Sequence, residues 1–246
     1  MPHKLHQFMI MNRIFMSVII VLILLCAWQF YAKNQETLRL RTLGNPNQVL
    51  TVDDKVYKTR SSIFRSLEKP DAQHKIVFLG DSITQNCNWN ELFSNDNILN
   101  RGISGDTTAG ILKRINDIVY LKPTKLFLMA GINDFSLGRT AQQVTRNDVH
   151  IIDTIRHELP ATKIYVQSTL PINNALNKYA TTPAQIEALN ANLQKICREK
   201  RIVFINLYPF FSDSTQHLKI KYTFDGTHLN GKGYQLWKNK IKKYVD

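Results

Sequence analysis

The ten residues from Lys75 to Thr84 read KIVFLGDSIT, and they contain the pattern on which the fold prediction depends. Four consecutive apolar positions, Ile76 to Leu79, are typical of a strand buried on both faces of a parallel sheet. The Gly-Asp-Ser that follows ends the apolar run with turn-forming residues. Four later segments repeat the short apolar pattern: Ile98 to Ile103, Lys125 to Ala130, Lys163 to Ser168 and Ile202 to Leu207. The sequence therefore predicts a mainly parallel sheet built from these five segments.

Helical patterns fill the segments between the expected strands. Thr140 with Gln143 forms a capping box ahead of an apolar stripe, and Thr182 followed by Pro183 marks a second helix start. A third apolar stripe, from Ile111 to Val119, repeats at helical spacing. Strands and helices are thus expected to alternate along the chain.

A further helix is expected before the first strand. Asp53 or Asp54 is placed to cap it, its apolar pattern runs to Leu67, and Pro70 is expected to end it. With this helix included, the alternation predicts one doubly wound α/β domain over residues 55–246, with right-handed crossovers between the strands.

Composition excludes several classes of protein. The chain has 246 residues, 43% of them hydrophobic, and 32 Lys and Arg against 19 Asp and Glu give a net charge of +13. This apolar content excludes a disordered protein, and three Cys without a Cys-x-x-Cys spacing do not make a disulfide framework or a zinc ribbon.

The basic residues are spread along the chain, so no nucleic-acid partner is predicted. Their one concentration, Lys238 to Lys243, is interpreted as the solvated face of a C-terminal amphipathic helix, with attraction to an anionic membrane or envelope polymer as the alternative.

An apolar segment lies near the N-terminus. Ile14 to Trp28 reads IFMSVIIVLILLCAW, in which Ser17 is the one clearly polar residue. Extended to Tyr31, a helix over this segment would be about 27 Å long, close to the roughly 30 Å of a bilayer core. A cleaved signal peptide and a buried core helix are the alternatives, but no good small-x-small cleavage site follows the run. We predict an uncleaved signal anchor over residues 1–33, a linker over 34–54 and the α/β domain over 55–246.

Polar residues collect where the expected strands end. In an open parallel sheet, ligands bind beyond the carboxyl ends of the strands. The turns there are Gly80–Thr84, Gly102–Asp106, Gly131–Asp134 and, after a longer stretch, Asp225–His228. They supply a serine hydroxyl, a histidine, carboxylates, a side-chain amide and backbone N–H groups beside glycine. These are the parts that an acyl-transfer site requires.

Four blocks in these turns resemble the motifs of the SGNH hydrolases, also called GDSL esterases and lipases. They read G-D-S-I-T from Gly80, N-R-G-I-S-G-D-T-T from Asn100, G-I-N-D from Gly131 and D-G-T-H-L-N from Asp225. The resemblance implies a flavodoxin-like, three-layer α/β/α domain and a Ser-His-Asp site with Gly and Asn in its oxyanion hole, without a cofactor or a metal. The segment WNELF from Trp89 is closest to the branch that contains platelet-activating-factor acetylhydrolase-like and carbohydrate acetylesterase-like members.

The chemistry of the individual residues agrees with these roles. Ser82 follows a buried strand and precedes a helix, so its hydroxyl is expected at the rim of the sheet as a nucleophile; a helix N-cap is its alternative role. His228 can take the serine proton and return it to the leaving alcohol. Asp225, three residues earlier, can orient the other ring nitrogen and stabilise the imidazolium.

The expected oxyanion hole consists of the backbone N–H groups of Ser82 and Gly105 and the side-chain amide of Asn133. Gly105 can adopt φ > 0 and would let the chain approach substrate without a side chain in the way. Ordinary turn roles are the alternatives for Gly105 and Asn133. Arg101 is a candidate for contacting a polar or anionic substrate, and bracing of the rim is its equal alternative. The remaining carboxylates of these turns are expected to act as caps and braces: Asp81, Asp106 and Asp134.

The predicted function is that of a membrane-anchored, extracytoplasmic serine esterase. It would remove a short acyl group, with acetyl favoured, from a carbohydrate or a small lipid. An O-acyltransferase acting on an envelope polysaccharide is the second hypothesis, because a sugar hydroxyl could capture the same acyl-enzyme. A lysophospholipase or lipase and a non-catalytic carbohydrate-binding domain are further alternatives, and the intact Ser82, Asp225 and His228 argue against the last of these. The expected partners are the acyl-ester substrate and, through the N-terminal helix, a membrane; secretion after signal cleavage is the alternative.

Overall fold

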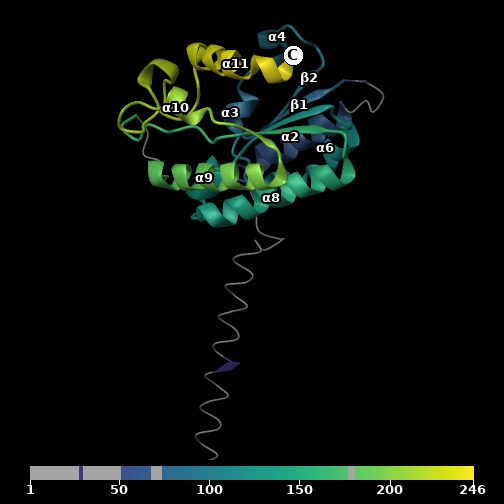
Figure 1. Cartoon of the computed structure of the whole chain (residues 1–246), viewed down its shortest axis with the longest axis horizontal. Helices are drawn as coiled ribbons and strands as arrows, with labels where there is room; N and C mark the ends of the chain where they lie inside the picture. Colours follow the sequence, from purple (N-terminus) through teal and green to yellow (C-terminus); the bar gives the residue numbers. More distant parts are fainter. Residues whose placement is uncertain (1–27, 30–50, 68–73, 177–180) are drawn as a thin grey trace, which may run out of the picture. The chain divides into compact units, whose positions relative to one another are not determined.

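The computed structural model describes residues 28–29, 51–67, 74–176 and 181–246. The chain divides into two compact units, residues 1–48 and 49–246, and the second contains a five-stranded sheet. All strand pairs are parallel and the order is β2-β1-β3-β4-β5, which confirms the predicted parallel sheet (Figure 1). This is the flavodoxin-like order. The strands are β1 (Ile76–Gly80), β2 (Ile98–Gly102), β3 (Lys125–Met129), β4 (Lys163–Gln167) and β5 (Val203–Ile205).

Helices cover both faces of the sheet. One face carries α3 (Ser82–Gln85), α4 (Trp89–Phe93) and α11 (Gly231–Val245); the other carries α5 (Thr108–Lys113), α6 (Ile115–Leu121), α8 (Ala141–Glu158) and α9 (Pro183–Lys200) (Figure 1). Every residue of β1 is buried, as the uninterrupted apolar run predicted. Four further elements complete the described part of the second unit: α2 (Asp54–Ser66), α7 (Ile132–Ser136), α10 (Tyr208–Phe211) and the 3₁₀ helix η1 (Ile220–Tyr222).

The helix starts read from the sequence are confirmed. Thr140 and Thr182 both cap their helices through complete capping boxes with a glutamine three residues later. Asp53 caps α2, because its carboxylate accepts the N–H of Val56 at 3.0 Å. That helix ends at Ser66, close to the predicted end at Leu67.

The stripe from Ile111 to Val119 forms two short helices, whereas the sequence pattern suggested one. Arg114 interrupts them, with φ −110° and ψ 15°. Its guanidinium donates hydrogen bonds to the Asp106 carboxylate and to the carbonyls of Gly80 and Arg101. These contacts with buried acceptors hold Arg114 out of helical geometry. The break therefore results from tertiary contacts that the local pattern does not contain.

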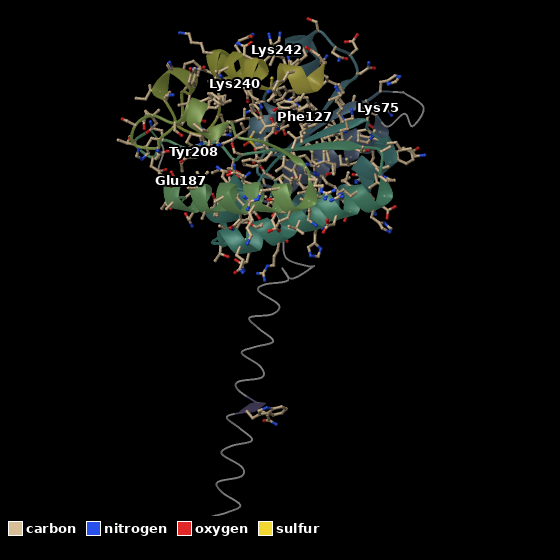
Figure 2. The ribbon with its side chains drawn as sticks, viewed as in Figure 1. Lys75, Phe127, Glu187, Tyr208, Lys240 and Lys242 are labelled. Carbon is tan, nitrogen blue, oxygen red and sulfur yellow. The ribbon has the colours of Figure 1, made fainter. Side chains whose placement is uncertain are left out.

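An aromatic stack fills the space between the sheet and α11. The Phe78 ring lies 4.3 Å from that of Trp89 and 4.8 Å from that of Phe127, which Figure 2 shows inside the domain. Trp237 of α11 packs edge-on against Trp89 at 4.8 Å. Pairs of this kind contribute about 0.5–1.5 kcal/mol each beyond area burial. The hydroxyl of Tyr234 also donates to the carbonyl of Ile83, so α11 is fixed directly over α3.

The predicted membrane anchor lies almost wholly outside the described residues. Of residues 14–31, only Trp28 and Gln29 are described, and both are helical. In the part of the chain that the structure covers, no helix is both long and apolar enough to cross a bilayer. The anchor therefore stays a prediction from sequence.

The end of the predicted linker, from residue 51, belongs to the second unit. Thr51 forms an antiparallel bridge with Asp106, and the backbone N–H of Val52 donates to the carbonyl of Gly105 at 2.9 Å. The chain thus joins the domain at the turn that follows β2.

Candidate active site

The turn after β1 brings Ser82 to the edge of the sheet. A side chain at Gly80 would collide with the Met129 carbonyl and the Thr84 hydroxyl, so glycine is needed there for the close approach of β3 and α3. Asp81 then caps α3, because its carboxylate accepts the N–H of Ile83 at 2.9 Å. Ser82 is the first residue of that helix and is only 6% exposed. Its position agrees with the prediction of a hydroxyl between strand and helix.

Ser82, His228 and Asp225 form a continuous chain of hydrogen bonds. The Ser82 Oγ and His228 Nε2 atoms are 2.9 Å apart, and His228 Nδ1 lies 2.6 Å from Asp225 Oδ2. In this arrangement Nδ1–H donates to the carboxylate, which leaves Nε2 as the acceptor for the serine proton. The structure therefore brings together the three residues that the sequence analysis selected, across 146 positions of the chain.

The environment of Asp225 favours its ionised form. Partial burial acts to raise the pKa of this carboxyl, but hydrogen bonds from the His228 ring and from the N–H groups of Thr227 and His228 lower it to about 2. Those N–H groups approach Oδ1 at 2.9 and 2.8 Å, while Oδ2 faces the imidazole. Asp225 is therefore charged over the whole neutral range and can stabilise a protonated His228.

The turn that carries His228 is held on both sides. Thr223 Oγ1 accepts the N–H of Gly226 at 2.9 Å, and Thr223 forms an antiparallel bridge with Leu229. Gly226 has φ +84°, and a side chain there would collide with the carbonyl of Asn173. The Gly226 carbonyl accepts the N–H of Asn173 at 2.7 Å, so hydrogen bonds on both sides of Gly226 support the turn that carries the imidazole.

Gly105 has the positive φ that the sequence analysis expected, +74°. Its carbonyl accepts hydrogen bonds from the Val52 N–H at 2.9 Å and the Thr51 hydroxyl at 3.0 Å. A Cβ atom at Gly105 would lie 3.1 Å from the Asp53 backbone nitrogen. The missing side chain at Gly105 thus leaves room for residues 51–53, and the approach of this turn to substrate stays a prediction.

Asn133 lies in α7, directly after the turn that follows β3. Its side-chain nitrogen donates to the carbonyl of Asp106 at 2.9 Å, in the turn that also carries Gly105. An amide nitrogen has two N–H groups, so this contact orients the side chain and leaves a second donor. Gly131 adopts φ +113° and packs so closely on α8 and α9 that a side chain there would meet Val144 and Leu189.

A layer of buried ion pairs lies beneath these turns. Asp106 pairs with Arg114 at 2.8 Å, and Asp134 pairs with Arg139 at 2.6 Å while accepting the Thr108 hydroxyl at 2.7 Å. The predicted bracing role of the two aspartates is confirmed. The two arginine partners were not predicted from the sequence. Arg114 could have been identified as one of them, because it is a charged residue inside an apolar helical stripe.

Arg101 lies beneath α2. Its guanidinium carbon is 4.7 Å from the centre of the Phe64 ring, and Nη1 donates to the carbonyl of Asn100. The residue is 6% exposed. These contacts support bracing of the rim, and none of them joins Arg101 to the Ser82–His228 pair. The substrate contact therefore stays a prediction without support from the described geometry.

The other described histidines have ordinary surroundings. His157 lies 2.9 Å from Glu158 at an exposed position, and the half-buried His217 lies 2.9 Å from the hydroxyl of Thr215. Within residues 28–29, 51–67, 74–176 and 181–246, no group of three or more His, Cys, Asp or Glu side chains is arranged to hold a metal ion.

Comparisons with known proteins agree with this geometry. The sequence model of the GDSL-like Lipase/Acylhydrolase family matches residues 78–236, a range that includes Ser82, Gly105, Asn133, Asp225 and His228. The alpha1 subunit of platelet-activating factor acetylhydrolase IB from Homo sapiens is 28% identical over 173 residues, which cover 68% of this chain and 73% of the human chain. The alpha2 subunit from Rattus norvegicus is 29% identical over 175 residues, 68% and 74% of the two chains. A GDSL-like lipase structure from Bacteroides thetaiotaomicron has a TM-score of 0.67 and 25% identity, and the match covers 77% of this chain and 96% of that one.

Proposed function

Because the chain belongs to the GDSL-like lipase/acylhydrolase family and is an ester hydrolase, we propose that it is a serine esterase with Ser82 as nucleophile, His228 as general base and Asp225 as the partner of His228. The observation that supports this assignment is the hydrogen-bonded chain of 2.6 and 2.9 Å from Asp225 through His228 to Ser82.

In the first half of the proposed reaction, Ser82 Oγ attacks the carbonyl carbon of the ester while its proton passes to His228 Nε2. The carbonyl oxygen becomes an oxyanion, and the N–H groups of Ser82, Gly105 and Asn133 donate hydrogen bonds to it. The bond to the alcohol oxygen then breaks, and His228 returns the proton to that oxygen. The products of this half are the free alcohol and an acyl-Ser82 ester.

In the second half, water takes the place of the alcohol. His228 accepts a proton from the water as its oxygen attacks the acyl carbon, and the same N–H groups bind the oxyanion. The bond from the acyl carbon to Ser82 Oγ breaks, and the serine recovers its proton from His228. The carboxylic acid leaves, and no cofactor is consumed.

For the acyl group we propose acetyl, carried by a carbohydrate or a small lipid alcohol. The support is the name of the relatives at 28% and 29% identity, which are acetylhydrolase subunits. The test is product analysis with acetyl, butyryl and long-chain esters, with and without sugar acceptors. Release of free acetate supports the proposal, whereas transfer of the acyl group to a sugar hydroxyl identifies an acyltransferase.

Replacing the nucleophile tests the mechanism. Ser82→Ala should lower turnover by about 10³-fold or more and abolish labelling by an organophosphonate ester, because the covalent route is lost. Ser62→Ala, at an exposed position on α2, is the matched control and should keep full activity and labelling. Full activity of Ser82→Ala would overturn the proposed mechanism.

For location we propose that residues 14–31 anchor the protein in a membrane with the catalytic domain on the extracytoplasmic side. The support is the apolar run from Ile14 to Trp28 and the lack of a good cleavage site after it. The mature protein should therefore begin at or near Met1 and remain in the membrane fraction. A mature N-terminus near Ala32 or Lys33, found by N-terminal sequencing or mass spectrometry, would overturn this proposal.

A further inference from the structure

Exposed apolar side chains gather beside the turn that carries Asp225 and His228. Phe224 directly precedes Asp225 and is 88% exposed, and Ile220 of η1 is 66% exposed. Leu176 and Phe210 are 44% and 42% exposed. We call these four residues, Phe210, Ile220, Phe224 and Leu176, the apolar rim patch.

Contacts of the backbone place the members of the apolar rim patch next to one another. The N–H of Thr223 donates to the carbonyl of Ile220, which closes a turn over residues 220–223, and Phe224 directly follows this turn. Lys219 donates from its ammonium group to the carbonyl of Phe210 at 3.0 Å. On the other side, the Cβ of Leu176 would be 3.2 Å from a Cβ at Gly226. The patch thus extends from α10 across η1 to the catalytic turn.

Lysines surround this patch. Lys219 and Lys221 flank Ile220, and Lys240 of α11 lies with its ammonium 3.7 Å from the centre of the Phe210 ring. Figure 2 shows Lys240 and Lys242 on α11. Lys232 is the second residue of the same helix, and the N-cap Asn230 donates to the carbonyl of Lys221.

The charge of this part of the chain is one-sided. Residues 208–246 contain seven Lys and three Asp. Of the three, Asp213 is hydrogen-bonded to Thr215 and His217, Asp225 is paired with His228, and Asp246 is the last residue of the chain. Part of this excess lies at the apolar rim patch, because Lys219 and Lys221 flank Ile220 and Lys240 contacts the Phe210 ring. The last turn of α11, with Lys242 and Lys243, lies instead near the amino end of β3, where Lys125 Nζ donates to the carbonyl of Val245.

A single exposed apolar side chain on a protein surface is ordinary, but a cluster with a lysine border is not. Apolar side chains that enter the headgroup region of a bilayer, together with lysines that attract anionic lipid, are the two contributions on which peripheral membrane binding depends. We propose that the apolar rim patch docks on an anionic lipid bilayer, with Ile220 and Phe224 in the headgroup region and the surrounding lysines against lipid phosphates.

The reach of the chain favours a bilayer over a soluble polymer as the occupant. Thr51 is bound to the Gly105 turn at the carboxyl end of β2. The residues that precede it in the sequence include the apolar segment from Ile14 to Tyr31. The 19 residues from 32 to 50 can span up to about 65 Å when extended, which is ample for the rim to reach the same bilayer.

The docking proposal is tested with an environment-sensitive fluorophore on the full chain. Cys26→Ser removes the cysteine of the apolar segment, while Cys87 and Cys197 are buried. I220C then carries the label at the patch. V203C, at the amino end of β5 and 42% exposed, carries it at the opposite end of the sheet. Both proteins are reconstituted in phosphatidylcholine vesicles with and without phosphatidylglycerol.

We expect the I220C label to shift to a blue, lipid-like emission in vesicles that contain phosphatidylglycerol and to remain water-like in neutral ones. The V203C label should remain water-like in both. Adding Lys221→Gln and Lys232→Gln should weaken docking of the I220C protein about 25-fold, at about fivefold per lysine near an anionic surface. Lys122→Gln with Lys163→Gln, two exposed lysines elsewhere, is the control pair and should leave docking unchanged.

Three results would overturn the docking proposal. They are a water-like I220C label on anionic vesicles, an equal shift of the V203C label, and a shift produced equally well by soluble dextran sulfate, which would identify an anionic polymer as the partner. The proposal does not depend on hydrolysis, so the I220C protein with Ser82→Ala must give the same shift. If the I220C protein with Ser82 intact showed the shift but no ester hydrolysis, that result would count against the proposed function alone.

Discussion

Two aspartates lie beside Ser82 and His228, the proposed catalytic residues, and the structure gives them opposite surroundings. Asp81 directly precedes Ser82, is 2% exposed, and accepts one backbone N–H from Ile83. Asp225 precedes His228 by three residues, has a side chain that is 44% exposed, and accepts hydrogen bonds from the His228 ring and two backbone N–H groups. Burial raises the pKa of Asp81 to about 7, whereas the hydrogen bonds of Asp225 outweigh its partial burial and lower its pKa to about 2.

The comparison shows that distance along the chain from a catalytic residue does not decide the role of a carboxyl group. Asp81 is next to the nucleophile but is held where its charged form is disfavoured, so it serves as a cap for α3. Asp225 reaches solvent and the imidazole, so its charge is stable and available to His228. The following variants test this division, from the largest expected effect to the smallest.

Asp225→Asn should have the largest effect. The asparagine keeps an oxygen for the backbone N–H groups, but its amide allows the wrong tautomer of His228 and supplies no charge to the imidazolium. We expect kcat to fall by about 10⁴-fold, measured with a water-soluble ester. An equally large loss in Asp81→Asn, with Asp225→Asn little affected, would reverse the roles of the two aspartates.

Asn133→Ala should cost less, because it leaves both aspartates and the nucleophile in place. Loss of one oxyanion donor is expected to lower kcat by about 10²- to 10³-fold with little change in KM, while slow labelling by an organophosphonate persists. Steady-state kinetics and the labelling rate measure these two effects. A change in KM alone would assign Asn133 to substrate binding or to the turn, and the proposed oxyanion hole would be wrong.

Asp81→Asn should alter the pH dependence of stability. The folded chain keeps the Asp81 proton up to a pKa of about 7, while the unfolded chain releases it near the ordinary value of 3.8, so this group makes the natural protein less stable as pH rises between these values. The Asp81→Asn variant has no carboxyl group at this position, so it does not lose this stability as pH rises. The difference in unfolding free energy, variant minus natural chain, should therefore rise by about 3 kcal/mol between pH 4.5 and 8, as measured by urea unfolding.

Asp225→Asn is the matched control for this stability measurement. Because the folded pKa of Asp225 is lowered to about 2, its contribution to stability is complete above pH 4 and is lost as pH falls toward 2. Because the His228 ring contacts Asp225 and also titrates in this range, the comparison is made on a His228→Ala background. Between pH 4.5 and 8, adding Asp225→Asn to His228→Ala should give a constant stability difference. A slope like that of Asp81→Asn would mean that the two carboxyl groups do not differ as described.

Much of the fold was predictable because its signals are local. The run IVFLG of β1 is apolar at consecutive positions, and the structure buries all five residues in a parallel sheet. The Thr140 and Thr182 caps were equally readable, since a capping box involves residues only three positions apart. The break between α5 and α6 at Arg114 could not be predicted in this way. It depends on hydrogen-bond acceptors at Gly80, Arg101 and Asp106, which come close to Arg114 only when the chain folds.

For the candidate site, the sequence by itself determined which residue types stand at the ends of β1, β2 and β3 and in the turn before α11, because strand periodicity and turn chemistry are properties of neighbouring residues. Only the tertiary structure decided how they meet. It placed His228 against Ser82, set Arg101 under Phe64, and bound Thr51 to the Gly105 turn. It also set the opposite pKa shifts of Asp81 and Asp225, because the electrostatic free energy of a carboxylate depends on the burial and the hydrogen-bond donors that distant segments supply.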